Sequence, residues 1–183
     1  MDHLNSDNLE NGLLTARLET ENLIWSQDEN RIILVDNLSD HQERVRARKI
    51  GQIANRELHH DGGIYHESDP ADSRDIHLYL YVSNARVVGF AIFEKRDCVC
   101  KYTWDEYDKR IQKELKAHSP IWSLGLIWFH KKYRKTGIAT QLFQIGLKHL
   151  NIGINKIGLY TPFSDEGEAW ARATFENEFI IAK

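Results

Sequence analysis

Residues 121–139 read IWSLGLIWFHKKYRKTGIA, an apolar run followed by a basic turn. The run over residues 121–129 has the length and composition of a strand that is buried on both faces. From residue 136 to residue 150, apolar side chains recur at helical spacing and predict a helix. The next apolar stretch, residues 157–160, predicts a second strand. The order strand, helix, strand indicates a right-handed crossover between two parallel strands.

Two apolar stretches near the start, residues 23–25 and 32–35, flank a polar turn and predict a hairpin. Ser39 and Gln42 have the spacing of a capping box. The apolar positions that follow recur at helical spacing up to about residue 58. A long amphipathic helix is therefore expected after the first hairpin.

The middle and the end of the sequence predict further strands and helices. A second hairpin is expected over residues 76–82 and 87–93. A charged, exposed helix is expected over residues 104–117. A last helix over residues 166–177 and a short strand over residues 179–182 follow the crossover.

The composition indicates one soluble domain. The chain has 183 residues, 42% of them hydrophobic, which is enough for a single sizeable core. We expect one domain over residues 21–183 and an arm over residues 1–20. The longest apolar stretch is far shorter than the roughly 20 residues of a membrane span. The start lacks the features of an export signal, so we expect a cytoplasmic protein, or a nuclear one in a eukaryotic source.

The net charge and the spacing of the cysteines, histidines and acids argue against a nucleic-acid-binding protein and against a metal site. A net charge of -3 argues against direct binding to nucleic acid, which usually comes with a basic excess. Cys98 and Cys100 are one residue apart, a spacing that gives a poor disulfide and half of a zinc site. Residues 59–75 predict a long loop whose histidines and acids are irregularly spaced. We therefore expect no metal.

The basic turn before the central helix has the chemistry of an anion site. Gly137 lets a ligand approach the main chain closely, and the amides that enter the helix add the favourable dipole. Arg134 and the neighbouring lysines would supply charge, Arg as a planar fork and Lys as a point charge. A diphosphate fits this cradle. An ordinary solvated turn and a nucleic-acid patch are the alternatives.

Residues 133–139, YRKTGIA, resemble the Q/R-x-x-G-x-G/A signature with which the GNAT acetyltransferases bind acetyl-CoA. The preceding hairpins and amphipathic helix are also similar to that superfamily. The resemblance implies an α/β fold, the GNAT fold, in which helices flank a mixed, mostly antiparallel central sheet and acetyl-CoA lies between diverging parallel strands. The cofactor-binding residues that it implies are Phe129, Arg134, Lys135, Thr136, Gly137, Ile138, Ala139 and Thr140.

A closer resemblance is to the catalytic domain of the cohesin acetyltransferases, and it covers roughly residues 22–183. The similar stretches are residues 31–35, residues 86–94, Ile127-Trp128 before Arg134, and residues 163–171. That family carries a C2H2 zinc finger ahead of its catalytic domain, whereas residues 1–21 contain no cysteine. The resemblance implies a protein lysine as the acceptor.

Acetyl transfer needs a neutral acceptor amine. Deprotonating a lysine of pKa near 10.4 at pH 7 costs about 4.6 kcal/mol, so a base must assist. Asp165 is the first candidate for this base. In an ungapped match with the cohesin acetyltransferases, Pro162 instead aligns with the catalytic aspartate of that family. Glu94, at the end of the second hairpin, is the second candidate. The resemblance to the superfamily implies that a main-chain N–H near Phe129 binds the oxyanion.

The resemblance therefore predicts an acetyl-CoA-dependent N-acetyltransferase that acts by direct transfer to a primary amine. Superfamily members often use a tyrosine as the acid for the leaving thiolate, and the matching region offers Thr174 or Phe175. Two alternatives stay open. The acceptor could be a small-molecule amine, or the chain could be a catalytically silent CoA-binding module. The sequence does not indicate an oligomeric state.

Overall fold

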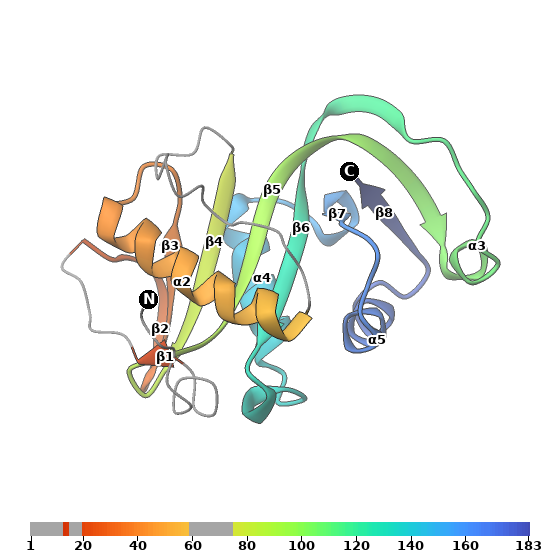
Figure 1. Ribbon diagram of the computed structural model, residues 1–183. Helices are drawn as coiled ribbons and strands as arrows, with labels where there is room; N and C mark the ends of the chain where they lie inside the picture. The colour runs from red at the N-terminus through yellow and green to blue at the C-terminus, as the bar shows by residue number, and fades with distance from the viewer. Residues whose placement is uncertain (1–12, 15–19, 59–74) are drawn as a thin grey trace.

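The computed structural model describes residues 13–14, 20–58 and 75–183, which fold around one mixed sheet (Figure 1). The sheet has the strand order β2-β3-β4-β5-β6-β7-β8, with β1 paired to β5. The strands are β1 (Leu13–Leu14), β2 (Asn22–Gln27), β3 (Asn30–Val35), β4 (Ile76–Ser83), β5 (Arg86–Thr103), β6 (Lys116–Phe129), β7 (Gly158–Leu159) and β8 (Glu178–Ala182). The described helices are α2 (His41–Leu58), α3 (Trp104–Asp108), α4 (Ile138–Leu150) and α5 (Asp165–Thr174), with the 3-10 turns η1 (Lys131–Tyr133) and η2 (Ile154–Lys156).

The sheet is mostly antiparallel. Neighbouring strands from β2 to β6 run antiparallel, whereas β6 and β7 run parallel, as do β7 and β8. Strand β8 also pairs with the far end of β5, over residues 99–103. The predicted fold class, both predicted hairpins and the parallel pair after the central helix are confirmed.

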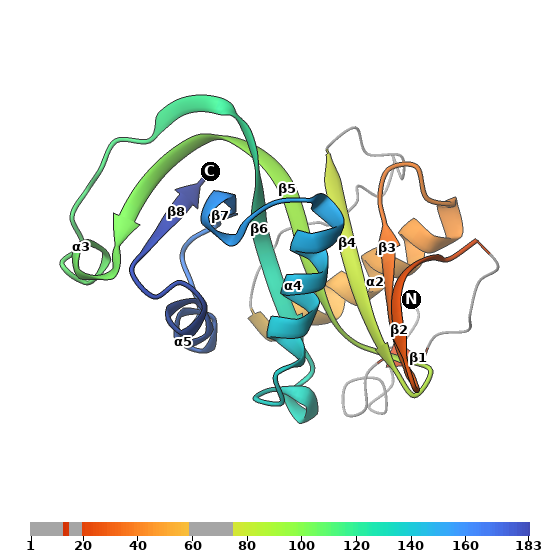
Figure 2. The ribbon, with the colours of Figure 1, turned by 180° about the vertical axis from the view of Figure 1, so that it is seen from behind.

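Helices cover both faces of the sheet, with α2 on one face and α4 on the other (Figure 2). Alternate residues of β3 supply the two faces. Ile33 and Val35 pack with Ile50 of α2, whereas Ile32 and Leu34 belong to the core beneath α4. Because successive side chains of a strand point to opposite faces and both faces are covered, residues 32–35 of this strand are all apolar.

Strands β5 and β6 continue as a two-stranded arm that arches over β7 and β8 (Figure 1). The arm overturns the later part of the predicted helix over residues 104–117. Helix α3 begins with a capping box at Thr103 and ends near Arg110, which has a φ of 51°. From Lys116 the chain pairs with β5 instead, because this satisfies its main-chain groups in a ladder.

The start of α2 differs from the predicted capping box. Oδ1 of Asp40 accepts a hydrogen bond from the Gln42 N–H at 2.8 Å, so Asp40 is the cap. Oγ of Ser39 instead accepts from the Asp36 N–H at 3.0 Å. The Ser39 hydroxyl therefore stabilises the turn at Asp36 and does not cap α2 as predicted.

Three other boundaries lie close to the predicted ones. Helix α4 begins two residues later than predicted, because Gly137 has a left-handed φ of 86°. Helix α5 ends at Thr174 rather than near residue 177, and β7 is two residues long. The predicted arm over residues 1–20 and loop over residues 59–75 fall almost wholly outside the described residues. Among the described helices, none has the length and apolar character needed to cross a membrane.

Gly89 of β5 lies opposite Phe129, the last residue of β6, and the Phe129 ring occupies the space where a Gly89 side chain would stand. We expect Gly89→Ala to lower the free energy of unfolding by about 1–3 kcal/mol, because the added methyl overpacks the core. Urea unfolding measures this change. Gly153→Ala is the control, since its added methyl would meet the movable side chain of Asn155. Equal stability of Gly89→Ala and the unsubstituted protein would contradict this packing.

Candidate active site

Strands β6 and β7 separate soon after they pair. They are matched at Ser123 with Gly158 and at Leu124 with Leu159, and the Tyr160 N–H then donates to the Leu124 carbonyl at 3.0 Å. Beyond this point β6 continues to its end without β7 beside it. A register shift against β5 makes Gly125 an extra residue, which is a β-bulge at the apex of the split.

The open edge of β6 exposes main-chain groups. The His130 N–H donates to the Val88 carbonyl of β5 at 2.8 Å. Because main-chain groups alternate in direction along a strand, those of Trp128 face β5, and those of Ile127 and Phe129 face the split. The Phe129 carbonyl accepts a hydrogen bond from Nε of Arg134 at 2.7 Å. The Ile127 N–H therefore points toward the space that β7 has left.

The start of α4 adds further main-chain donors. The first hydrogen bond of the helix joins the Gln141 N–H to the Gly137 carbonyl at 3.1 Å. The N–H groups of Ile138, Ala139 and Thr140 come before it and lack a partner within the helix, as at any helix N-terminus. Among the described residues, nothing lies within 4 Å of a Cβ built on Gly137. The space in front of these amides can hold an anion.

A cavity of about 550 Å³ joins the open edge of β6 to the start of α4. Its wall is closed by Leu58 at the end of α2 and by residues at the start of α5. Trp170 of α5 also lines it and donates from Nε1 to Oγ1 of Thr140 at 3.2 Å, which ties α5 to α4. The predicted cofactor residues that line this cavity are Phe129, Arg134, Lys135, Thr136, Gly137, Ala139 and Thr140.

The remaining predicted cofactor residue, Ile138, packs against the main core. Arg134 was expected to supply charge for an anion, but its partners in the structure are protein carboxylates. Its guanidinium forms ion pairs with Glu57 of α2 and, at 2.9 Å, with Glu166 of α5. Sequence reasoning missed Glu57, because its contact with Arg134 joins residues far apart in the chain.

Glu94 lies at the apex of the split, opposite Ser123. A Cβ built on Gly125 would come within 2.7 Å of its Oε1, so the carboxylate lies over the bulge. Arg96 forms an ion pair with Glu94, and its guanidinium lies 5.1 Å from the ring centre of Tyr160. The sequence did not single out Arg96 or Tyr160. Arg96 thus contacts both Glu94 of its own strand and Tyr160, which follows β7.

Asp165 lines the cavity, whereas Glu94 is not among the described residues that line it. Asp165 is the exposed first residue of α5, after the cap Ser164, whose Oγ accepts from the Gly167 N–H at 3.1 Å. The next residue, Glu166, reaches Arg134 beyond the end of β6. The two predicted catalytic carboxylates therefore lie at opposite ends of the open edge, Glu94 at the apex and Asp165 near the start of α4.

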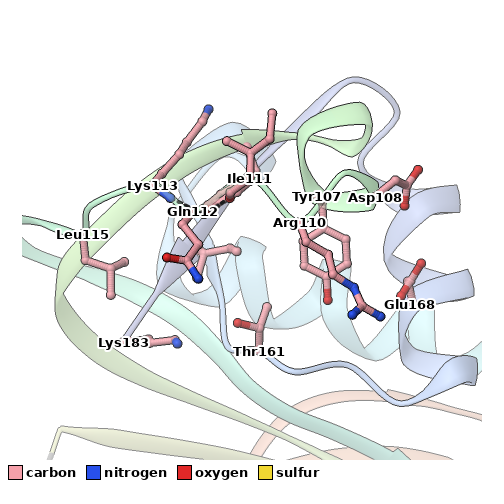
Figure 3. Close-up of a pocket in the computed structure, with 12 residues that line it drawn as sticks. Tyr107, Asp108, Arg110, Ile111, Gln112, Lys113, Leu115, Thr161, Glu168 and Lys183 are labelled. Atoms are coloured by element: carbon pink, nitrogen blue, oxygen red, sulfur yellow. Dashed lines mark hydrogen bonds between the residues drawn. The ribbon is translucent and has the colours of Figure 1, made fainter.

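A second cavity, of about 650 Å³, lies beside α3 (Figure 3). Arg110 extends toward Glu168 of α5 in this view. The Asp108 and Glu168 carboxylates both pair with Arg172, so ion pairs already compensate these acids. In residues 13–14, 20–58 and 75–183, no three His, Cys, Asp or Glu side chains gather as a metal site would require.

Comparison with solved structures reveals the fold. The xEco2 acetyltransferase domain bound to a K105-CoA conjugate superposes with a TM-score of 0.70 and 16% identity, over 90% of this chain and 98% of that one. A second structure of the xEco2 acetyltransferase domain gives 0.67 and 16%, over 91% and 98%. An aminoglycoside acetyltransferase, meta-AAC0020, from an uncultured soil metagenomic sample gives 0.54 and 8%, over 80% and 88%.

The chain thus has the fold of the GNAT acetyltransferases. Its expected likeness to the cohesin acetyltransferases is also confirmed at the level of structure. At the level of sequence, no family model and no curated protein matches the chain.

Gly137→Glu tests the anion cradle. The new carboxylate would stand in front of the α4 amides and repel a diphosphate, so we expect acetyl-CoA binding in a calorimetric titration to be lost. Gly153→Glu, a matched change at the start of η2, should bind as the unsubstituted protein does. Because an L residue at the left-handed φ of Gly137 costs about 1–2 kcal/mol, thermal unfolding must first show that the variant is folded. Unchanged affinity in a folded Gly137→Glu variant would reject the cradle.

Proposed function

We propose that this protein is an acetyl-CoA-dependent N-acetyltransferase that transfers the acetyl group directly to a primary amine, a protein lysine. The observation that carries the proposal is one cavity that joins the open edge of β6 to the free amides of α4. A strand edge suits an extended amide-containing arm, and a helix start suits a diphosphate. Acetyl-CoA contains both parts, because its thioester is attached to an extended amide-containing arm that leads to a diphosphate.

The residues present fit the cofactor. The amides of Ile138, Ala139 and Thr140 would hold the diphosphate, with added charge from Lys135, an exposed residue that lines the cavity. The Ile127 main chain would bind the arm that runs along β6. The aromatic rings of Trp128 and Trp170 line the cavity with apolar surface. The thioester end then reaches the bulge at Gly125.

When bound, acetyl-CoA supplies a thioester carbonyl carbon that the acceptor nitrogen attacks. The Glu94 carboxylate, over the bulge, would take the proton that a neutral acceptor amine loses on forming the N–C bond. The Ile127 N–H would donate to the carbonyl oxygen, a contribution worth about 3 kcal/mol for one donor. Protonated Glu94 would then return that proton to the thiolate released from the broken C–S bond. Arg96 keeps the Glu94 side chain over the bulge through its ion pair.

The choice of acceptor rests on the comparison of structures. The similarity to the xEco2 domain spans 98% of that chain, and that domain holds a K105-CoA conjugate. The aminoglycoside acetyltransferase superposes less well, at a TM-score of 0.54. This difference supports a lysine side chain over a small-molecule amine. This comparison distinguishes only between the two classes of acceptor, because both of these proteins are acetyltransferases.

Acetyl-CoA binding and turnover test the proposal directly. We expect a calorimetric titration to show one site per chain, and release of free CoA to accelerate with lysine peptides. Small amines such as polyamines and aminoglycosides should accelerate it less. Faster release with a small amine would assign that acceptor class instead. Binding without turnover on any acceptor would favour a silent CoA-binding module, and absence of binding would reject the proposal.

Glu94, which lies over the bulge, and Asp165, which lines the cavity, are two carboxylates that can be compared as the base. We expect Glu94→Gln to lower kcat by about 10²–10⁴-fold, the usual contribution of a general base, with acetyl-CoA affinity retained. Asp165→Asn, which removes the same charge near the start of α4, should change kcat little. Steady-state kinetics at saturating acetyl-CoA separates the two. A large loss in Asp165→Asn with a normal rate in Glu94→Gln would make Asp165 the base.

A further inference from the structure

Arg134 stands at the first position of the predicted cofactor motif, yet each of its three nitrogens already contacts a protein group. Nε donates to the Phe129 carbonyl at 2.7 Å. The two terminal nitrogens pair with Glu166, at 2.9 Å, and with Glu57. Each of its three nitrogens therefore contacts a different element: β6, α5 or α2.

The local charge disfavours a phosphate at this side chain. One guanidinium lies between the carboxylates of Glu57 and Glu166, so the group carries a net charge of -1. A diphosphate brought against it would meet two negative charges and one positive charge. Lys135 lies next in the chain, is exposed and lines the same cavity, so it is the better placed cation.

The partners of Arg134 surround the free end of β6. Glu57, in the last turn of α2, also accepts a hydrogen bond from Nε1 of Trp128 at 3.1 Å. Glu166 lies in the first turn of α5. The bonds from Arg134 and Glu57 thus fix two consecutive residues of β6, Trp128 and Phe129, at the strand end that lacks β7 as a neighbour.

We propose that Arg134 is a positioning residue, which fixes the open end of β6 between α2 and α5 and does not bind the diphosphate. This inference rests on the proposed function, because it concerns how the same cavity holds acetyl-CoA. The strut formed by Glu57, Arg134 and Glu166 keeps the Ile127 and Phe129 main chain in the orientation that the thioester arm requires. Charge for the diphosphate comes from the α4 amides and Lys135.

Two acetyl donors separate positioning from phosphate binding. Acetylpantetheine has the thioester arm of acetyl-CoA but lacks the nucleotide diphosphate. We expect Arg134→Gln to lower kcat/KM by the same factor for both donors, roughly tenfold to a hundredfold, since small misplacement of reacting groups has effects of that size. Lys135→Gln should lower kcat/KM for acetyl-CoA alone. A loss in Arg134→Gln that is confined to acetyl-CoA would overturn the inference.

Conservative variants sharpen the distinction. Arg134→Lys keeps the charge and loses the planar fork, so it should behave like Arg134→Gln, whereas a phosphate contact would be largely rescued by lysine. Glu57→Gln should reduce kcat/KM for both donors in the same proportion. Arg172→Gln is the matched control, because Arg172 also joins two carboxylates, Asp108 and Glu168, but lies away from this cavity. Its kinetic constants should be unchanged.

Unfolding of the protein without cofactor gives a readout that does not depend on activity. If Arg134 and Glu57 act as one strut, the Tm loss of the double variant Arg134→Gln/Glu57→Gln is smaller than the sum of the two single losses. Additive losses would contradict the strut. Failure of the unsubstituted protein to use either donor would reject the proposed function, while this unfolding cycle would still decide whether the strut exists.

Discussion

The free edge of β6 is the constraint on which the rest of the site depends. Several main-chain N–H groups border one cavity and make no hydrogen bond within α4 or to a neighbouring described strand. They arise because β7 leaves β6 after two residue pairs and because Gly137 starts α4 without a preceding helical turn. These amides form a row of donors that a bound molecule can satisfy. An acetyl-CoA molecule laid along β6 would replace the missing strand and supply the missing anion.

The surrounding structure keeps this edge open. The bulge at Gly125 bends β6 at the apex, and the Arg134 strut fixes the other end of the edge against α2 and α5. Between them, the cavity stays continuous because α5 forms its far wall and Trp170 ties that wall to α4. The arm of β5 and β6 adds pairing partners for β8, which closes the sheet on the other side of β7. Rigid elements therefore frame a gap in the sheet.

The sequence predicts the central part of the fold well, because local patterns determine it. The apolar run over residues 121–129 identified most of β6, and helical spacing identified α4 to within two residues of its start. The helix predicted over residues 104–117 is confirmed only for residues 104–108, and residues 116–117 pair with the long arm of β5, which no local pattern reveals. The partners of Arg134 and the contact of Arg96 with Tyr160 could not be predicted for the same reason. Each depends on contacts between residues far apart in the chain.

Amide hydrogen exchange, measured with and without saturating acetyl-CoA, tests the central claim most directly. The account predicts that the N–H groups of Ile138, Ala139, Thr140 and Ile127 exchange more slowly in the complex, because the ligand becomes their hydrogen-bond acceptor. Slower exchange elsewhere, with these four amides unchanged at saturation, would show that acetyl-CoA binds at another place and would contradict the account.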